Sequence, residues 1–401
     1  MPLWRLSPFP FLFVLVVWLA GCASDTVRAP HGAAEIVPLE KRAVHRADSG
    51  PHHDQPPLTI TIAAVGDIML GTDFPKNHLP DDDGASLLAP MQPTLAAADV
   101  AFGNLEGTLL SGGEPAKQCR DPERCWLFRT PPRYARWLAE AGFDVMSLAN
   151  NHARDFGEEG RAASMQALQA AGIAHTGQEG DVAILDVKGR SLAVIAFAPF
   201  RGAHDMLDIP AAAERIRQLA VENDIVMVSM HAGAEGPDVQ HVPFGEEFYF
   251  RENRGDVVAF AHAMIDAGAD LVVGHGPHVP RALELYRGRL VAYSLGNFCT
   301  YYGINVAGTR GLAPVLLARL DETGRFLGGR IVSARQRRPA GPLPDPGHAA
   351  ARFMARLTRE DFPGTALAIT ADGEIRRQDR HPAVFRGGIA GFAADKPSGD
   401  L

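Results

Sequence analysis

Short apolar runs, separated by amphipathic stretches, recur between residues 58 and 300. The first run, LTITIAAVGD at 58–67, has the alternating β-branched residues that are typical of a strand. Further strand-like runs lie at 98–107, 143–152, 182–187, 191–200, 224–233, 269–278 and 290–298. Stretches with a helical period separate several of them, near 132–141, 158–171, 211–222 and 255–268. Strands that alternate with helices predict an α/β sheet architecture with helices packed outside.

The segments on either side of this region have a different pattern. Residues 23–57 are rich in Pro, His, Ala and charges without periodicity, which predicts a flexible tether. Residues 316–336 have the pattern of a hairpin, and the tail beyond about 340 contains one expected helix near 348–359. The expected organisation is a signal peptide, a tether, a main domain and a C-terminal extension, at 1–21, 22–57, 58–335 and 336–401.

The N-terminus has the features of a targeting segment. Its apolar stretch, Phe9 to Ala20, is too short to span a bilayer, which takes about 20 residues. It ends in Leu19-Ala20-Gly21-Cys22, which resembles the lipobox of bacterial lipoproteins. The resemblance implies a lipidated Cys22 as the new N-terminus and a membrane anchor. Because Ala23 follows, and no aspartate, it also implies an outer-membrane lipoprotein facing the periplasm if the host is Gram-negative. An ordinary secretory signal with a chance cysteine is the alternative.

Composition and charge narrow the functional classes. The chain has 401 residues, of which 46% are hydrophobic and 21% charged, an ordinary balance for a globular protein. The net charge of −8 argues against a general nucleic-acid binder, which needs a basic face. Cys119 and Cys125 lie six apart in a polar stretch, and in an exported protein this predicts a local disulfide rather than a metal site. Cys299 is expected to be a buried free thiol.

Polar side chains follow most of the predicted strands. In open α/β sheets the functional crevice lies beyond the carboxyl ends of the strands. The groups found there are Asp67, then Asn104 with Glu106, then Asn150-Asn151-His152 with Asp155, then His231, then His275 with His278, and finally Ser294 before Gly296-Asn297. Each group alone has an ordinary explanation, as a turn cap or as a hydrogen-bonded core histidine. Their recurrence favours a metal site, and oxygen and imidazole donors suit Mn, Fe or Zn better than a thiolate site does.

The motifs VGDIMLG, GNLEGTL, LANNHARDFG, HAGAE, VVGHGPHV and YSLGNF together resemble the CapA family, which is implicated in poly-γ-glutamate capsule synthesis. The resemblance covers roughly residues 58–300. It implies a calcineurin-like metallophosphoesterase fold: a sandwich of two mixed β-sheets flanked by helices (α/β/β/α). A divalent metal site of one or two ions (Mn, Zn or Fe) is expected at the strand ends.

The resemblance also implies roles for individual residues. Asp67 matches the first metal-ligand aspartate, but Met69 stands where the phosphoesterase Asp-x-His pattern has its histidine. Asn104 holds the place of the bridging carboxylate, so Glu106 is expected to supply the charge. The remaining expected ligands are Asn151, His231 and His275 with the second metal, and His278 with the first.

Residues beside the expected ligands are candidates for chemistry and substrate contact. His152 matches the histidine that meets substrate, and Asp155 is expected to orient its ring and to raise its pKa. Arg154, Ser294 and Asn297 are candidate substrate-binding residues. Five arginines are candidates for a groove that binds an anionic polymer, although solvated surface arginines are the commoner explanation: Arg129, Arg133, Arg154, Arg201 and Arg251.

Three functions are consistent with these features. One is a metal-dependent hydrolase or transferase that acts on poly-γ-glutamate or another anionic envelope polymer. The second is a non-catalytic assembly or export factor that binds such a polymer, for example within a capsule synthase or export complex. The third is a conventional phosphoesterase, which the absence of a histidine at Met69 disfavours. In each case we expect a membrane partner through the lipid anchor and no nucleic acid.

Overall fold

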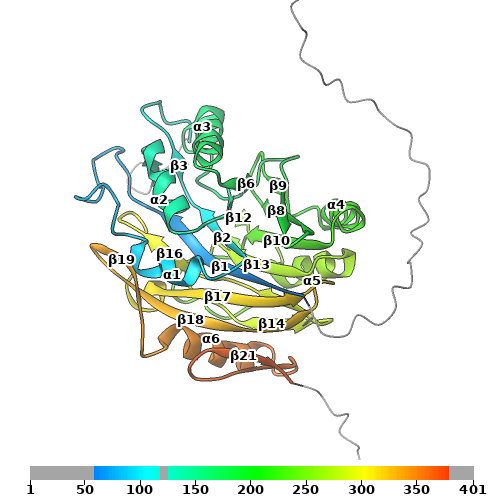
Figure 1. The fold of residues 1–401 in the computed structure, drawn as a ribbon. Coiled ribbons are helices and arrows are strands. Elements are labelled where there is room, and N and C mark those ends of the chain that lie inside the picture. The colour runs from blue at the N-terminus through cyan, green and yellow to red at the C-terminus, as the bar shows by residue number, and fades with distance from the viewer. Residues whose placement is uncertain (1–57, 118–124, 379–401) are drawn as a thin grey trace, which may run out of the picture. The chain divides into compact units, whose positions relative to one another are not determined.

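The computed structural model describes residues 58–117 and 125–378, and two large β-sheets organise them (Figure 1). The main strands of the first sheet, in spatial order, are β20 (Leu367–Ile369), β21 (Glu374–Arg377), β18 (Phe326–Arg337), β17 (Leu312–Asp321), β1 (Thr59–Met69), β2 (Val100–Leu105), β5 (Val145–Ser147) and β6 (Ala174–Thr176). In addition, β16 (Asn297–Thr300) pairs with β1, and β19 (Ala340–Pro344) pairs with β18. The sheet is mixed, because β1 is parallel to β2 and β16 but antiparallel to β17.

The second sheet is also mixed. Its spatial order is β14 (Leu283–Tyr286), β15 (Arg289–Ala292), β13 (Leu271–His275), β10 (Ile225–His231), β8 (Arg190–Ala198) and β7 (Ala183–Val187), with β9 (His204–Asp205) beside β8. The four central strands β8, β10, β13 and β15 are parallel, and the outer strands β7 and β14 are antiparallel to their neighbours. Two small ladders lie outside both sheets: β3 (Thr108–Leu109) with β4 (Arg129–Thr130), and β11 (Phe248–Tyr249) with β12 (Glu252–Asn253).

The alternation of side chains along each strand explains why the two sheets pack face to face. In β1, Ile60 and Ile62 belong to a core shared with the second sheet, whereas Ala63 and Val65 belong to a separate core on the other face. In β10, Met227 lies in the shared core. This period of two is the one predicted from the sequence, and it gives each sheet one face for its partner and one for helices.

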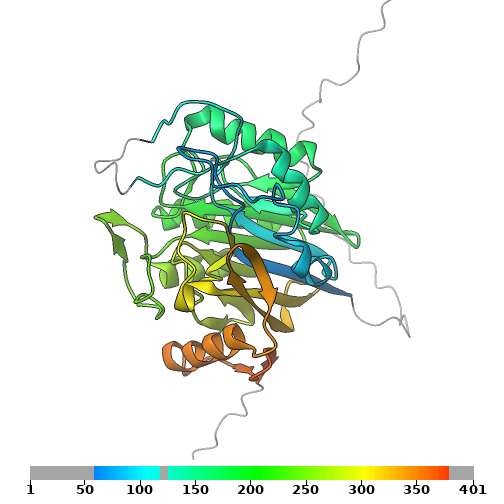
Figure 2. The same ribbon diagram turned by 90° about the vertical axis from the view of Figure 1, so that its left-hand side faces the viewer.

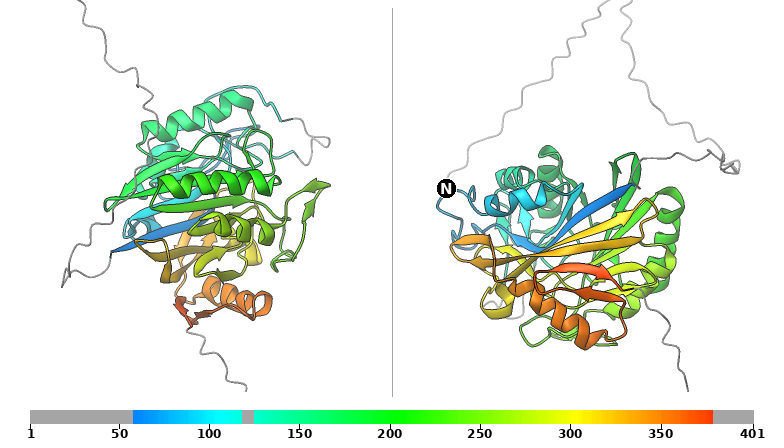
Figure 3. Two further views of the ribbon diagram at one scale, coloured as in Figure 1. Left: turned by 90° about the vertical axis from the view of Figure 1, so that its right-hand side faces the viewer. Right: turned by 60° about the horizontal axis from the view of Figure 1, so that its bottom comes forward.

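Helices cover the outer faces of both sheets. The core on the outer face of the first sheet includes residues from α1 (Gln92–Leu95), α2 (Ala135–Glu140) and α3 (Gly157–Ala170). The second sheet packs against α4 (Ile209–Glu222) and α5 (Val257–Ala267), which lie across its outer face in the left view of Figure 3. The predicted sandwich of two mixed sheets flanked by helices is therefore confirmed. Among the helices of the described residues, none is long and apolar enough to cross a membrane.

The C-terminal segment is part of the first sheet. The hairpin predicted at 316–336 is formed by β17 and β18, but β18 continues through residue 335, where the main domain was expected to end. Helix α6 (Ala349–Asp361) packs against β18, β17 and β14, and β21 pairs with β18 (Figure 2). Residues 336–378 thus complete the sandwich instead of forming a separate extension. The expected signal peptide and tether lie outside the described residues.

Parallel pairing brings the polar strand ends to one edge. In the first sheet, Asp67 at the end of β1 is in register with Asn104 of β2 and Asn297 of β16. In the second sheet, His231 of β10 is in register with His275 of β13. The sequence motifs therefore meet because of strand register, as expected for the carboxyl ends of parallel strands.

The opposite end of the second sheet contains a buried carboxylate that should make stability depend on pH. Burial raises the pKa of Asp270 from 3.8 to about 6, although Arg289 and the backbone N–H of Val226 oppose the shift. Because the folded state holds the Asp270 proton more tightly than the unfolded state does, this group adds to the free energy of unfolding at low pH. The contribution is complete below about pH 4 and is lost as the pH rises through about 6. As the pH rises from 4 to 7, we therefore expect the free energy of unfolding of Asp270→Asn to increase by up to about 3 kcal/mol relative to that of wild type. Guanidinium unfolding of both proteins at the two pH values measures this, and a constant difference would contradict it.

Candidate metal centre

The end of β1 is held in place by a very close backbone contact. A Cβ atom at Gly66 would lie 2.0 Å from the carbonyl oxygen of Gly296, so this position requires glycine. The next residue, Asp67, donates its backbone N–H to the same oxygen at 2.8 Å. This contact fixes the Asp67 carboxylate, which is fully buried, at the edge where the two sheets meet.

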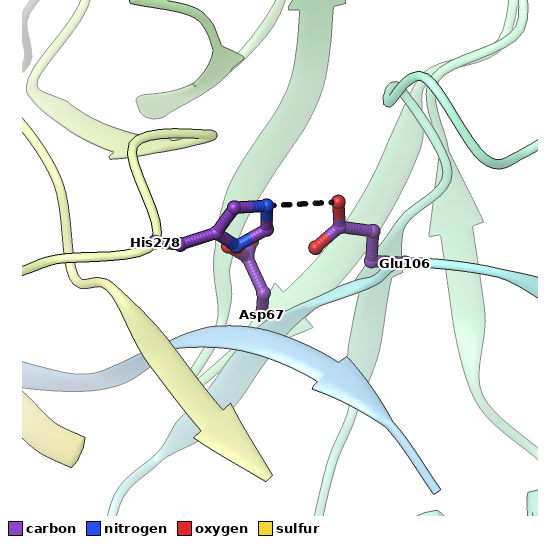
Figure 4. A group of neighbouring side chains, drawn as sticks. All are labelled: Asp67, Glu106 and His278. Atoms are coloured by element: carbon purple, nitrogen blue, oxygen red, sulfur yellow. Dashed lines mark ion pairs between the residues drawn. The ribbon is translucent and has the colours of Figure 1, made fainter. Parts of the chain in front are cut away.

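Three side chains from distant motifs point toward one another at this edge (Figure 4). His278 Nδ1 lies 3.1 Å from Asp67 Oδ2, and His278 Nε2 lies 3.6 Å from Glu106 Oε1. One potential ligand atom from each residue lies within 4.8 Å of the others, a spacing that could accommodate a metal ion. His278 has a positive φ of 58°, a conformation that is uncommon for a residue other than glycine.

Two histidines of the second sheet complete what we call the central cluster, which consists of Asp67, Glu106, His231, His275 and His278. His275 Nδ1 lies 3.5 Å from Asp67 Oδ1, and His231 Nε2 lies 4.0 Å from Glu106 Oε1. Both residues are 1% exposed, so water competes little for their rings. The predicted convergence of these ligands is therefore present in the geometry.

The donor atoms of this cluster fit a metal ion. Buried polar atoms normally have hydrogen-bond partners, because an unsatisfied group costs about 1–3 kcal/mol. Several buried atoms here have none among the described residues: Asp67 Oδ2, both carboxylate oxygens of Glu106, His231 Nε2 and both ring nitrogens of His275. Asn151 Oδ1, outside the cluster, is likewise buried without a partner in this part of the chain. These atoms are oxygen and imidazole donors, the set that suits Mn, Fe or Zn. A divalent cation would give a partner to the carboxylate oxygens and to one nitrogen of each ring, since a neutral imidazole offers a single lone-pair nitrogen.

The electrostatics of the cluster also favour a cation. Burial and the neighbouring charge of Asp67 raise the pKa of Glu106 well above its usual range, despite the opposing effect of His278. Burial lowers the pKa of His278, but the charges of Glu106 and Asp67 outweigh it and raise the pKa to about 10. Burial likewise raises the pKa of Asp67, but the close approach of the His275 and His278 rings outweighs it and brings the pKa far below normal. Two carboxylates in one dry site thus attract positive charge.

Asn104 and Asn150 arrange the cluster. Asn104 Nδ2 donates to Asp67 Oδ1 at 2.9 Å and lies 3.2 Å from His231 Nδ1, so that Nε2 of this ring remains free. The Asn104 side-chain oxygen accepts from Asn150 Nδ2 at 3.1 Å. Asn104 was expected among the metal ligands. Both ends of its amide are engaged in these hydrogen bonds, which orient Asp67 and His231; its role as a ligand stays a prediction.

His152 lies beside the cluster with its ring oriented by a carboxylate. Its Nδ1 is 2.8 Å from Asp155 Oδ2, an oxygen that also accepts from the backbone N–H of Phe128 at 2.8 Å. Asp155 was expected to raise the pKa of His152. Its charge does act in that direction, but burial is the larger effect and the pKa of His152 is lowered. His152 also lines a cavity of about 220 Å³ together with His278.

None of the three expected substrate-binding residues lines this cavity. Ser294 is fully buried, and its hydroxyl donates to the backbone oxygen of Val279 at 2.7 Å. Asn297 is also fully buried, and its Oδ1 lies 2.9 Å from His278 Nδ1. Ser294 therefore stabilises a turn and Asn297 orients a candidate ligand, which corrects the expectation for both. Arg154, in contrast, lines a cavity next to Asn151.

Sequence reasoning assigned no role to Glu235, which the structure places beside the cluster. Its Oε2 lies 3.9 Å from His278 Nε2, and its Oε1 accepts from Arg254 at 2.9 Å. It lines the same cavity as His152 and His278. The available signal was its position in the HAGAE motif, four residues after His231.

The structure describes two of the four cysteines, Cys125 and Cys299. Cys299 is buried and free, as expected, and burial raises the pKa of its thiol. Cys125 is disulfide-bonded. Cys119 and the lipidation site Cys22 lie outside the described residues, so the pairing with Cys119 and the lipid anchor remain predictions.

Known proteins resemble this chain in sequence and, more distantly, in structure. It is 29% identical over 262 residues to the capsule biosynthesis protein CapA of Bacillus anthracis, which covers 62% of this chain and 61% of that protein. It is 27% identical over 285 residues to the PGA biosynthesis protein CapA of Bacillus subtilis (strain 168), which covers 67% and 70%. The chain thus spans less than two thirds of the B. anthracis relative.

Among solved structures, a 5′-nucleotidase precursor from Thermus thermophilus matches with a TM-score of 0.39 and 13% identity, over 72% of this chain and 54% of that one. This TM-score is too low to support an inference, so the fold assignment depends on the sheets and helices described above. The family model described as "Bacterial capsule synthesis protein PGA_cap" matches residues 61–302, which include every residue of the central cluster. Since that match covers more than half of the chain, the protein belongs to this family of bacterial capsule synthesis proteins.

Proposed function

We propose that this chain performs metal-dependent hydrolysis or transfer on a γ-linked glutamate polymer, or on a related anionic envelope polymer, during capsule synthesis. The observation that carries the proposal is the central cluster with its unpartnered buried donor atoms beside a cavity. The substrate class is suggested by the family and by the names of the relatives in the two Bacillus species.

The residues around the cavity have complementary roles in this proposal. Asp67, Glu106, His231, His275 and His278, with Asn151, would hold the ion. A divalent ion bound there supplies Lewis-acid polarisation of the carbonyl or phosphoryl oxygen under attack. Asp155 accepts a hydrogen bond from Nδ1 of His152 and fixes the ring, which leaves the unprotonated Nε2 to take a proton from the attacking water and pass it to the leaving group. In amide hydrolysis the C–N bond breaks, water supplies the new C–O bond, and the departing nitrogen takes up that proton.

A conventional phosphoesterase is a weaker candidate. The residue at the Asp-x-His position, Met69, packs in an apolar cluster with Phe128 and Ile304 and has no imidazole to offer. The altered ligand set favours a different reaction on the same scaffold.

An activity assay with metal tests the proposal. The purified chain would be incubated with high-molecular-mass γ-linked glutamate polymer and Mn²⁺, Zn²⁺ or Fe²⁺, and products followed by size-exclusion chromatography and by new amino groups. We expect metal-dependent shortening or transfer, abolished by EDTA. Tight polymer binding without any turnover would instead favour the non-catalytic assembly or export factor.

The proposal includes attachment to the cell envelope through Cys22, an inference from the sequence alone. The mature protein should begin at Cys22 and fractionate with membranes, since a multiply acylated cysteine buries enough CH₂ groups, at about 0.8 kcal/mol each, for firm anchoring. Cys22→Ser should be released or left unprocessed. Membrane fractionation of correctly processed Cys22→Ser protein would refute the anchor. In a Gram-negative host, outer-membrane fractions should contain the wild type.

A further inference from the structure

A second cavity, rich in cationic side chains, lies beside the candidate metal centre. Its volume is about 330 Å³, and its walls include the cationic side chains Lys117, Arg154, Arg161 and Arg201. Asn150 and Asn151 also line it, so the cavity adjoins the loop that carries His152. We call it the basic cavity.

The cations of the basic cavity outnumber the carboxylates that pair with them. Asp155 lies 3.4 Å from Lys117 Nζ, and Glu158 is shared between Arg154 and Arg161. Arg201 is exposed and forms no ion pair with any residue that the structure describes. Two positive charges are therefore left in excess, and an excess of one sign in a concave site attracts the opposite charge.

Arg154 has unused hydrogen-bonding capacity. Its Nε is buried and has no hydrogen-bond partner among the described residues, although its Nη1 donates to the backbone oxygen of Arg201 at 3.1 Å. A planar guanidinium with a free donor can engage a carboxylate in a charge-assisted bond. The contact with the Arg201 backbone also holds the two arginines next to each other.

The basic cavity and the metal centre are positioned by the same loop. Within residues 150–155, Asn150 donates to the side-chain oxygen of Asn104, whose Nδ2 itself donates to Asp67, and the backbone oxygen of Asn151 accepts from Lys117 Nζ at 3.4 Å. His152 follows, and Arg154 comes two residues later. A ligand that reaches from the centre into the basic cavity would follow this loop.

We propose that the basic cavity is a carboxylate-binding subsite, which holds the free α-carboxylate of a γ-linked glutamate unit next to the unit at the metal centre. Each γ-linked unit carries one such carboxylate, so a polymer presents them at regular intervals. The inference depends on the proposed function for the identity of the polymer. It adds that Arg154 and Arg201 select an anionic neighbour, so that oligomers bind better than single units.

The test measures binding without relying on turnover. A fluorescein-labelled γ-linked glutamate oligomer is titrated with the purified chain in EDTA, and fluorescence anisotropy gives the Kd. Arg201→Gln should weaken binding about tenfold, as should Arg154→Gln, since each loses one charge-assisted contact. Arg201 is the sharper probe, because its exposed side chain has no ion pair to lose among the described residues. A γ-linked isoglutamine oligomer, in which an amide replaces each α-carboxylate, should bind all variants equally weakly.

Arg319→Gln is the matched control. Arg319 is an exposed residue of β17, in register with Thr61 at the far end of β1 from Asp67. Its substitution should leave the Kd unchanged. Wild-type affinity in both Arg201→Gln and Arg154→Gln would overturn the subsite, even if the enzyme cleaves the polymer. Weakened binding in both variants, in a protein that shows no turnover with any metal, would uphold the subsite and refute the catalytic proposal.

Discussion

Replacing His275 with Ala should weaken the binding of a divalent metal by at least about 100-fold, since even the loss of a residue that only supports a ligand typically costs 10–100-fold. His275 is buried, both of its ring nitrogens lack hydrogen-bond partners within residues 58–117 and 125–378, and its Nδ1 lies 3.5 Å from Asp67 Oδ1. Metal content after dialysis, measured by inductively coupled plasma mass spectrometry, gives the result directly. Metal should also raise the Tm of wild type much more than that of His275→Ala, because a ligand stabilises the state that binds it.

His175→Ala is the control for a lost buried histidine. His175 is also buried, but its ring bonds Asp181 and Gln169 outside the central cluster. Its removal should lower stability and leave metal binding intact. Equal metal content in wild type and His275→Ala would show that His275 is not a ligand.

Replacing His152 with Asn should reduce turnover on the polymer by about 10² to 10⁴, the usual contribution of a positioned acid or base. His152 lines the cavity and its Nδ1 is held by Asp155 at 2.8 Å, while no hydrogen bond among the described residues links its ring to the central cluster. Metal content and folding should therefore stay near wild type. The kcat on γ-linked glutamate polymer, together with metal analysis and circular dichroism, separates these effects.

His204→Asn tests whether the loss is specific to this position. His204 is a buried histidine of β9 that contacts the backbone oxygen of Asp181. The His204→Asn variant should retain the wild-type kcat per folded molecule. If His152→Asn retains it too and only unfolds more easily, His152 has a structural role in its loop.

Much of the sandwich was predictable, because burial on both faces leaves a clear pattern in the sequence. Strand β1 alternates residues between two cores, and the amphipathic stretches predicted near 211–222 and 255–268 correspond to α4 and α5. The strands near the C-terminus were harder to predict. β20 and β21 have only 3 and 4 residues, too short to show a period; β21 is held by pairing with the distant β18, and β20 pairs with β21.

The residues of the site were more predictable than their roles. Asp67, His231 and His275 end strands whose parallel order brings them to one edge. Whether a side chain keeps an atom available to bind a metal or a substrate depends on the hydrogen bonds that it makes with its neighbours. The sequence does not show these hydrogen bonds. The contacts of Asn104 with Asp67 and of Asn297 with His278 could not be read from the sequence for this reason.

Anomalous X-ray diffraction from crystals of the purified chain grown with Mn²⁺ or Zn²⁺ tests the central claim most directly. We predict an anomalous peak in the central cluster, at about 2.0–2.3 Å from side-chain atoms of Asp67, Glu106 and His278. A second peak beside His231 and His275 would show two ions instead of one. A cluster without any anomalous peak, in crystals whose metal binds only elsewhere, would contradict the account.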